Sequence, residues 1–402
     1  MRVAAVALAA VALAAVPAAT ARHADTPGVT DTTVKIGGTV PLSGPAAAFG
    51  VVGPGAAAYF AYVNDRGGVN GRKIQYEYLD DGYNPTQTVQ LTRQLVQQDN
   101  VFAIFNTIGT DNALAGRPFL KQLKVPMLYA GTGASDFGNP KDYPWSMPYL
   151  PNNVGEGALY GNYIKAKLPQ AKVGVLQEAD AYGADLTAGL KRALGKKVKI
   201  VDLEGYALTD TSVSSQVSKL KSSGANTLVV FATPQFAIQA FLAAHKLGWH
   251  PQFFLSSVSI EPTVMKIIAA STSEKFASGA LSMAFVKDPT SPVWAKDPAV
   301  KLYRQIMARY DPQGRPADVY NFYGMAVAFS MVDVLRKAGR NLTRDSLLKA
   351  ATHLTEANNP FLLPGIVLRT SPTDYFPLEQ ARLARYGKGL WTLFGPLVPA
   401  RL

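Results

Sequence analysis

The sequence predicts an α/β protein built from two doubly wound lobes, each with a largely parallel sheet. Short apolar runs alternate with helical segments from residue 34 onwards. The alternation pauses at a proline-rich stretch, residues 143–151, and then restarts. Strands separated by helices of about 10–15 residues imply right-handed crossovers, which make neighbouring strands parallel. A chain of 402 residues is long enough for two separate cores.

The first unit is predicted from residue 34 to residue 130. Its first helix places Ala56, Phe60 and Val63 on one face and stops at a glycine pair. A second helix begins at Asn84, which caps it, with Pro85 in the first turn, and a third covers 113–123. The predicted strands are 34–40, 73–79, 101–105 and 125–130.

The second unit repeats this alternation and ends in a β tail. Predicted helices cover 156–167, 184–194, 213–222 and 236–247, and predicted strands cover 172–176, 198–203, 227–231 and 252–255. A strand near 279–285 and two long helices, 299–310 and 320–338, follow. The tail from 365 to 398 is predicted to be β, with strands 382–386 and 390–394 joined by a Gly-Lys-Gly turn.

The N-terminus has the pattern of a secretory signal peptide at residues 1–21. Met1 and Arg2 precede an unbroken Ala/Val/Leu run, and the small residues after it offer an A-x-A cleavage site ending at Ala21. Residues 3–21 are also just long enough for an uncleaved membrane anchor, although Ala is weakly hydrophobic for that role. We expect export to the periplasm, and a protein free of a lipid anchor because the chain has no cysteine.

Composition excludes several classes of function. The formal net charge is +12, but Lys and Arg are scattered, without a basic block or a basic–aromatic repeat, so a nucleic-acid partner is not expected. The absence of cysteine excludes a Cys nucleophile and thiolate metal sites. The chain is 48% hydrophobic and 17% charged, as ordinary folded proteins are.

The candidate site is predicted where strands end. Ligands of open parallel sheets bind beyond the carboxyl ends of the strands, so both lobes should present strand-end loops to a shared cleft. These loops are residues 40–50, 105–112, 129–134, 178–183, 232–235 and 255–258. They hold glycines and hydroxyls rather than a clustered acid, base and nucleophile. The loops therefore predict ligand binding without catalysis, metal or cofactor.

Several residue patterns that could suggest a cofactor, metal or catalytic site have simpler structural explanations. Residues 53–58 satisfy G-x-G-x-x-A, but a dinucleotide fingerprint must follow its strand directly, so a helix start is favoured. Asp80 and Asp81 precede Gly82 and favour turn and cap chemistry over a metal or acid–base pair. No G-x-S-x-G turn is present. Four dispersed histidines are expected at the surface or in packing roles: His23, His245, His250 and His353.

Several stretches, in order and at matching spacing, carry a family resemblance. They are VKIGG at 34–38, PLSGP at 41–45, NDRGGVNGR at 64–72, LKSSGA at 220–225, LPG at 363–365 and TSPTD at 370–374. In these the chain resembles the leucine/isoleucine/valine-type substrate-binding proteins of branched-chain amino acid ABC transporters. The resemblance covers nearly the whole chain after the predicted signal peptide.

The resemblance implies an architecture and partners. The family's type I periplasmic-binding-protein fold has two lobes joined by three crossovers, which map near 147–152, 278–282 and 357–364. Lobe one would be 31–149 plus 281–353, and lobe two 150–280 plus 354–402. A monomer is implied, which hands a small carboxylate-bearing ligand to the membrane permease subunits of the transporter.

The resemblance also implies the ligand contacts. Family members that bind amino acids hold the carboxylate with backbone N–H groups and hydroxyls of two lobe-one loops, where glycine lets the backbone approach. The matching residues here are Gly109, Thr110, Asp111, Gly131, Thr132 and Gly133. Phe49 and Tyr182 stand where aromatic side chains cover the ligand, and Tyr320 or Tyr323 would form the far wall.

One departure from the family pattern concerns the ligand amine. Ser257 stands where an acidic residue neutralises an ammonium, and Thr233 where a second Tyr is usual. Burying an ammonium without a carboxylate is costly, so the anchor is missing unless Glu178 or Asp180 supplies it. Relatives that share GASDFG at 133–138 and LPGI at 363–366 include binders of aromatic and other organic acids. Amino acids and amine-free carboxylates therefore both stay open.

Two other classes of protein are alternatives to a transport receptor. An exported α/β enzyme would need a catalytic cluster at the strand ends, where the sequence has hydroxyls and glycines. A ligand-sensing receptor ectodomain shares the fold but would need a membrane-spanning segment after the second lobe. Transport is favoured over both.

Overall fold

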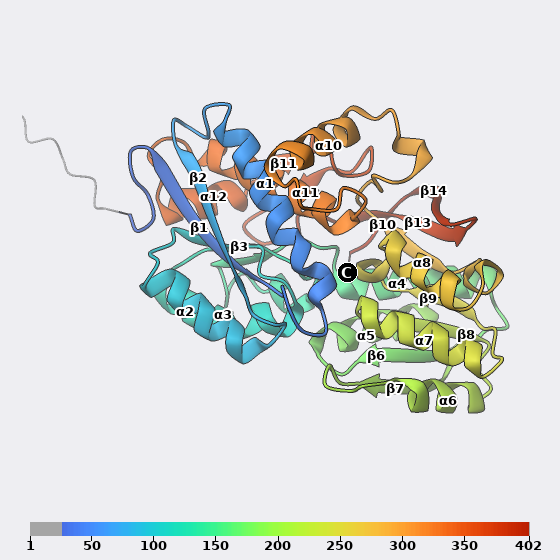
Figure 1. Cartoon of the computed structure of the whole chain (residues 1–402). Helices are drawn as coiled ribbons and strands as arrows, with labels where there is room; N and C mark the ends of the chain where they lie inside the picture. Colours follow the sequence, from blue (N-terminus) through green and yellow to red (C-terminus); the bar gives the residue numbers. More distant parts are fainter. Residues whose placement is uncertain (1–25, 402) are drawn as a thin grey trace, which may run out of the picture.

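The computed structural model describes residues 26–401 as two α/β lobes packed side by side (Figure 1). The predicted signal peptide and its cleavage site after Ala21 lie outside these described residues. Across 26–401, no helix is both long enough and apolar enough to cross a membrane.

Lobe one is built on a five-stranded parallel sheet with the order β2-β1-β3-β4-β5. The strands are β1 (Thr33–Val40), β2 (Lys73–Asp80), β3 (Ala103–Phe105), β4 (Met127–Ala130) and β5 (Ser146–Pro148). One face packs against α1 (Val52–Asn64), α10 (Pro298–Tyr310) and α11 (Val319–Ala338), and the other against α2 (Pro85–Gln97) and α3 (Thr110–Leu123). The doubly wound arrangement predicted for this unit is confirmed.

Local sequence explains where these helices begin and end. The Asn84 side chain accepts the N–H groups of Thr86 and Gln87 at the start of α2, which is the predicted cap with proline at the first position. Lys124 adopts a left-handed conformation and ends α3. Residues 53–58 lie within α1, so the G-x-G-x-x-A motif is a helix start, as expected.

Lobe two is built on a seven-stranded sheet with the order β14-β13-β10-β9-β8-β6-β7. Its strands are β6 (Lys172–Glu178), β7 (Lys199–Tyr206), β8 (Thr227–Phe231), β9 (Gln252–Leu255), β10 (Leu281–Ala284), β13 (Gln380–Gly387) and β14 (Leu390–Pro399). The first five are parallel, and the last two form an antiparallel hairpin. Lys388 and Gly389 both have positive φ, so the predicted turn is confirmed.

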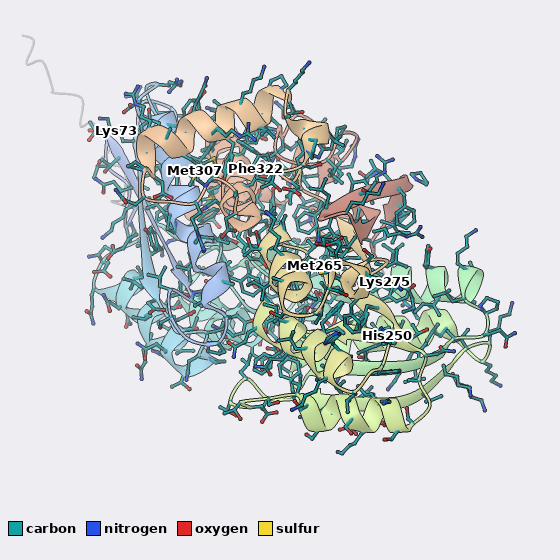
Figure 2. All side chains as sticks on the ribbon, turned by 45° about the vertical axis from the view of Figure 1, so that its right-hand side comes forward. Lys73, His250, Met265, Lys275, Met307 and Phe322 are labelled. Carbon is teal, nitrogen blue, oxygen red and sulfur yellow. The ribbon has the colours of Figure 1, made fainter. Side chains whose placement is uncertain are left out.

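Helices cover both faces of the second sheet. One face packs against α4 (Asn153–Lys167) and α5 (Ala181–Leu194), and the other against α6 (Ser214–Ser222), α7 (Pro234–Lys246), α8 (Pro262–Ser271) and α9 (Glu274–Ala277). Side chains follow the expected segregation in Figure 2. Lys73 and Lys275 lie exposed on different lobes, whereas Met307 and Phe322 are fully buried near α10 and α11.

The segment 354–378 packs on lobe one, which corrects the predicted boundary at residue 354. This segment follows α12 (Arg344–Ala351) and contains the short strands β11 (Thr355–Glu356) and β12 (Leu368–Arg369). Phe361 is fully buried in the lobe-one core, with its ring centroid 5.7 Å from that of Tyr59 and 5.2 Å from that of Phe322. The apolar run at 361–363 packs in the lobe-one core, where Phe361 contacts α1 and α11, so this segment belongs to lobe one.

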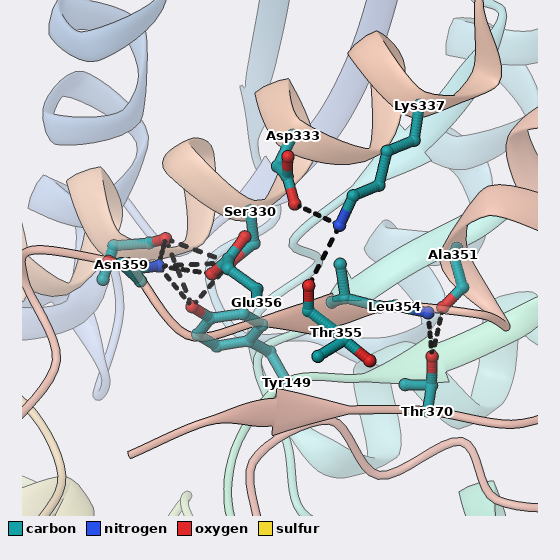
Figure 3. Close-up of polar contacts among 11 residues, drawn as sticks. Tyr149, Ser330, Asp333, Lys337, Ala351, Leu354, Thr355, Glu356, Asn359 and Thr370 are labelled. Atoms are coloured by element: carbon teal, nitrogen blue, oxygen red, sulfur yellow. Dashed lines mark hydrogen bonds and ion pairs between the residues drawn. The ribbon is translucent and has the colours of Figure 1, made fainter. Parts of the chain in front are cut away.

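Polar contacts fix the same segment (Figure 3). Glu356 accepts hydrogen bonds from Ser330 on α11 at 2.8 Å and from Asn359 at 2.9 Å. The Tyr149 hydroxyl, at the first crossover, donates to the Ala326 carbonyl at 3.1 Å.

Strand β10 also changes the predicted boundary. It pairs with β9 and β13 in the lobe-two sheet, although the predicted lobe one includes residues 281–284. We propose lobe limits of 26–149 plus 285–378, and 150–284 plus 379–401.

Helices α4 and α5 approach each other through glycine. A Cβ at Gly157 would overlap the Leu186 carbonyl oxygen, and one at Gly189 would overlap the Val154 carbonyl oxygen. Gly157→Ala is expected to lower the free energy of unfolding by about 1–3 kcal/mol, because forced overpacking outweighs the better helix propensity of alanine. Denaturant titration measures this. In Gly116→Ala, the nearest atom would be a Met127 methyl at 3.4 Å, so this matched helical variant should be no less stable than the wild type.

Candidate ligand-binding cleft

The strand-end loops of the two lobes enclose a cavity of about 500 Å³. All but two of the predicted site residues line it: Phe49, Gly109, Thr110, Gly131, Thr132, Gly133, Tyr182, Thr233, Ser257, Tyr320 and Tyr323. The exceptions are Asp111 and Asp180. The shared cleft expected from the parallel topology is therefore present in the structure.

The lobe-one side of the cleft is the N-terminus of α3. Gly109 has φ 104° and no side chain caps the helix, so the first-turn N–H groups are left without intrahelical acceptors. A Cβ at Gly109 would lie 2.7 Å from the Tyr83 ring, which explains why glycine is needed twice over. Helix dipole and free N–H groups together favour an anion at this place.

Two threonine hydroxyls lie beside this helix end. The Oγ1 atoms of Thr110 and Thr132 are hydrogen-bonded at 2.7 Å, and the Ala134 N–H donates to Thr132 Oγ1 at 3.0 Å. Both threonines are buried. One hydroxyl donates to the other, so the pair can still donate one O–H to a ligand oxygen.

Aromatic side chains form the walls. The Phe49 ring packs edge-on against Tyr320 with centroids 5.0 Å apart. The Tyr182 hydroxyl donates to Ser256 Oγ at 2.6 Å, the Tyr320 hydroxyl to the Val258 carbonyl at 2.7 Å, and the Tyr323 hydroxyl to Asn106 Oδ1 at 3.3 Å. Because these hydroxyls are engaged within the protein, the rings give the cleft a mainly apolar surface.

Tyr83 is a wall residue that sequence reasoning missed. It lines the cavity and has φ 60°. Asp81 Oδ1 accepts the Tyr83 N–H at 3.0 Å, and Asp80 Oδ1 accepts the Gly82 N–H at 2.9 Å. The expected turn chemistry of the two aspartates is thus confirmed, and it positions the tyrosine.

Ser257 is held from behind by a buried carboxyl group that the sequence did not reveal. Glu156, in the first turn of α4, accepts the Ser257 N–H at 2.7 Å and the Ser257 hydroxyl at 2.6 Å, and also the Tyr160 hydroxyl at 3.0 Å. Burial raises the pKa of Glu156, against the effect of these donors. The Ser257 proton therefore points away from the cleft, and Glu156 has little capacity left for a ligand.

The two predicted acids, Asp111 and Asp180, do not line the cavity. Asp180 caps α5 by accepting the Gly183 N–H at 2.9 Å, and Asp111 is exposed in the first turn of α3. Glu178 accepts the Tyr206 hydroxyl at 2.8 Å. Burial, with the charge of Asp180 adding to it, raises the pKa of Glu178; burial also raises the pKa of Asp180. Asp180 thus has a capping role, whereas Glu178 Oε1 is buried without a hydrogen-bond partner among the described residues.

Charge is sparse in the cavity. Of the residues between 26 and 401 that line it, Asp288 and Arg382 alone carry charged side chains. Neither comes from the loops that hold Thr110, Thr132 or Ser257: Asp288 follows β10, and Arg382 lies on β13. Among the described residues, the loops that hold Thr110, Thr132 and Ser257 therefore contribute no charged side chain to the lining.

The lobes touch across the cleft. The N–H and hydroxyl of Ser135, in lobe one, both donate to Asp185 on α5 at 2.7 Å. The bond from Tyr320 to the Val258 carbonyl joins the lobes at a second place. These contacts are the kind that hinge motion makes and breaks.

The remaining candidates have packing roles. His245 and His250 pack edge-on against Phe276, with centroids 4.9 and 5.0 Å apart, and His353 bonds the Lys349 carbonyl. His23 lies outside the described residues. Within residues 26–401, no group of three or more His, Asp or Glu side chains is placed to hold a metal ion.

Comparison with known proteins agrees with this geometry. A model of the periplasmic binding protein family matches residues 33–389. An amino acid binding protein of Pseudomonas aeruginosa is 28% identical over 198 residues, which are 48% of this chain and 52% of that protein. The match thus spans about half the length of that relative.

Solved structures resemble nearly the whole chain. A branched chain amino acid ABC transporter protein of Thermus thermophilus with bound valine has a TM-score of 0.80 at 16% identity, over 92% of this chain and 96% of that one. A fatty acid ABC transporter substrate-binding protein of Thermomonospora curvata has a TM-score of 0.78 at 21% identity, over 94% and 95%. The predicted type I fold is confirmed. A Leu/Ile/Val-binding protein homolog 2 of Brucella abortus is 24% identical over 316 residues, which are 78% of this chain and 81% of that protein, so the predicted resemblance to the leucine/isoleucine/valine-type members is confirmed. The chain belongs to the periplasmic binding protein family.

Proposed function

We propose that this protein is the periplasmic solute receptor of an ABC importer, which captures a small carboxylate in the cleft and delivers it to the permease subunits without chemical change. The observation that carries the proposal is a site suited to an anion and built without charged side chains: the start of α3 with Thr110 and Thr132, facing aromatic walls. Such a site grips a carboxylate through N–H and O–H donors. The family is one of substrate-binding proteins rather than enzymes.

Capture works by closure of the lobes. A ligand whose carboxylate lies on lobe one and whose body contacts Tyr182 and Ser257 of lobe two stabilises the closed state by its differential contacts. The Ser135–Asp185 and Tyr320–Val258 contacts then add to the closed state. The permease would recognise the closed pair of lobes, which presents a surface that the open form lacks.

An α-amino acid is the second candidate ligand. The Thermus thermophilus neighbour holds valine, and the Pseudomonas aeruginosa relative is named for amino acids. The lining of the present cavity favours an amine-free carboxylate instead, because none of the described residues that line this end of the cleft carries a carboxyl group. Ligand-sensing rather than transport would use the same site.

Thr132→Val is expected to weaken carboxylate binding by about 10- to 100-fold, because it removes a hydroxyl of the anion site. Isothermal calorimetry with 3-phenylpropionate measures the change, and Thr132→Ser should restore most of the affinity. Thr209→Val, at an exposed turn outside the cavity, is the matched control. Wild-type affinity in a folded Thr132→Val protein would rule out this anion site.

A further inference from the structure

The cavity does not end at the cleft. Besides the strand-end loops, its lining includes a second set of segments near the hinge: residues 284–286, residues 291–294 with the short helix η4 (Pro292–Trp294), and residues 390–393 of the terminal hairpin. In Figure 1, β13 and β14 lie beside β10, near the chain that leads to α10. We call this second part the hinge groove.

The hinge groove is apolar along most of its length. Its lining side chains include Val286, Pro292, Trp294, Leu390, Trp391 and Leu393. Val293 also lines it and is 78% exposed. Together with the other apolar side chains it forms a contiguous apolar surface, and such surfaces mark ligand-binding grooves.

The groove and the anion site are parts of one continuous cavity. Val258 and Ile260, which follow β9, line it together with Phe285 and Tyr320, and the Phe285 and Tyr323 rings pack edge-on at 6.4 Å. These apolar residues come from segments between the α3 end and the hairpin. A ligand can therefore keep its carboxylate at Thr110 and Thr132 while its body extends along them.

The cavity has room for a ligand larger than an amino acid. A cavity of about 500 Å³ falls within the range of roughly 300–1,000 Å³ that holds drug-sized molecules. A valine or leucine side chain would reach the first aromatic walls and leave the groove filled with water. Water among apolar side chains has few hydrogen-bond partners, so its displacement by an apolar group favours binding.

We propose that the ligand is an elongated monocarboxylate whose apolar tail, longer than an amino-acid side chain, occupies the hinge groove. This inference rests on the proposed carboxylate-binding function and names its substrate class. Arg382 donates its Nε–H to the Gly395 carbonyl at 2.7 Å, and Asp288 accepts the Thr290 N–H at 2.7 Å. Each charged side chain thus has a partner within the protein, on β14 or in its own turn, and the other groove residues are mainly apolar.

The test is calorimetry with straight-chain carboxylates from butanoate to decanoate, kept below micelle-forming concentrations. Each added methylene that enters the groove should raise the affinity about fourfold. Ala284→Phe fills the groove from β10, and Val293→Glu places a charge on its exposed rim. Both should flatten the rise for the longer acids, so that the ratio of decanoate to butanoate affinity falls well below that of the wild type. Leu123→Glu, at an exposed leucine of α3 outside the cavity, is the matched control and should rise as the wild type does.

The outcomes separate the two proposals. Wild-type affinity that stays level beyond butanoate would overturn the groove but keep the carboxylate receptor. Failure of every chain length to bind would overturn both. An affinity that climbs equally in the wild type, Ala284→Phe and Val293→Glu would place the tail elsewhere and overturn the groove. If Ala284→Phe does not fold, the exposed position of Val293 keeps the test available.

Discussion

3-Phenylpropionate is expected to bind at least about 100-fold more tightly than phenylalanine, from which it differs by the α-ammonium alone. An ammonium buried without a carboxyl partner costs at least a few kcal/mol, and about 2.7 kcal/mol corresponds to 100-fold. The Ser257 hydroxyl donates its hydrogen bond to Glu156 at 2.6 Å, so its oxygen can offer a ligand only one neutral acceptor. Three N–H donors with a full charge cannot be satisfied by it.

Calorimetry at pH 7 with two matched pairs checks this: 3-phenylpropionate against phenylalanine, and 4-methylpentanoate against leucine. A preference for the amino acids that disappears in Asp180→Asn or Glu178→Gln would show that one of these acids reaches the ammonium after lobe closure. An amino-acid preference that survives both substitutions would mean that Ser257 does not occupy the ammonium position. Tighter binding of both amine-free acids would agree with the neutral cleft.

Much of the fold could be predicted because its signals are local. Alternating strands and helices gave both parallel sheets, and the Gly-Lys-Gly turn marked the final hairpin, where Lys388 and Gly389 have positive φ. The predicted lobe boundaries were less accurate. Whether 354–378 packs on lobe one or lobe two depends on the contacts of Phe361 with Tyr59 and Phe322, and such contacts leave no periodic trace in the sequence.

The same distinction applies to the site. Strand-end position was enough to bring Thr110, Thr132, Tyr182 and Ser257 to one cavity, because a parallel sheet places all of its strand ends together. Glu156 could not be found in this way. It lies in the first turn of a helix 101 positions from Ser257 along the chain, in a place where an acidic residue is expected for the helix dipole alone. The hinge groove was missed for a similar reason, since its walls come from three separate segments.

Lowering the pH from 7 to 5 is expected to stabilise the protein through Glu356, near the first crossover (Figure 3). Burial raises the pKa of Glu356 from 4.5 to about 7, although Ser330 and Asn359 donate to it. Between these two values the folded protein keeps a proton that the unfolded chain has lost. A rise in pH therefore favours unfolding, by up to about 1.4 kcal/mol per pH unit for one group.

Glu356→Gln should remove this contribution, because glutamine can still accept from Ser330 and Asn359 and has no charge to bury. Denaturant titrations at pH 5, 6, 7 and 8 would then show a stability loss for the wild type that exceeds that of the variant by about 2.5 kcal/mol in total. Above pH 7 the difference should stop growing, because Glu356 is ionised in both states. Glu77→Gln, at the partly exposed partner of Lys35, tests the general effect of losing one negative charge. Two results would contradict this assignment: an equally flat curve for Glu77→Gln, or a curve for Glu356→Gln as steep as that of the wild type. The pH dependence would then come from other buried acids such as Glu261, whose pKa burial also raises to about 7.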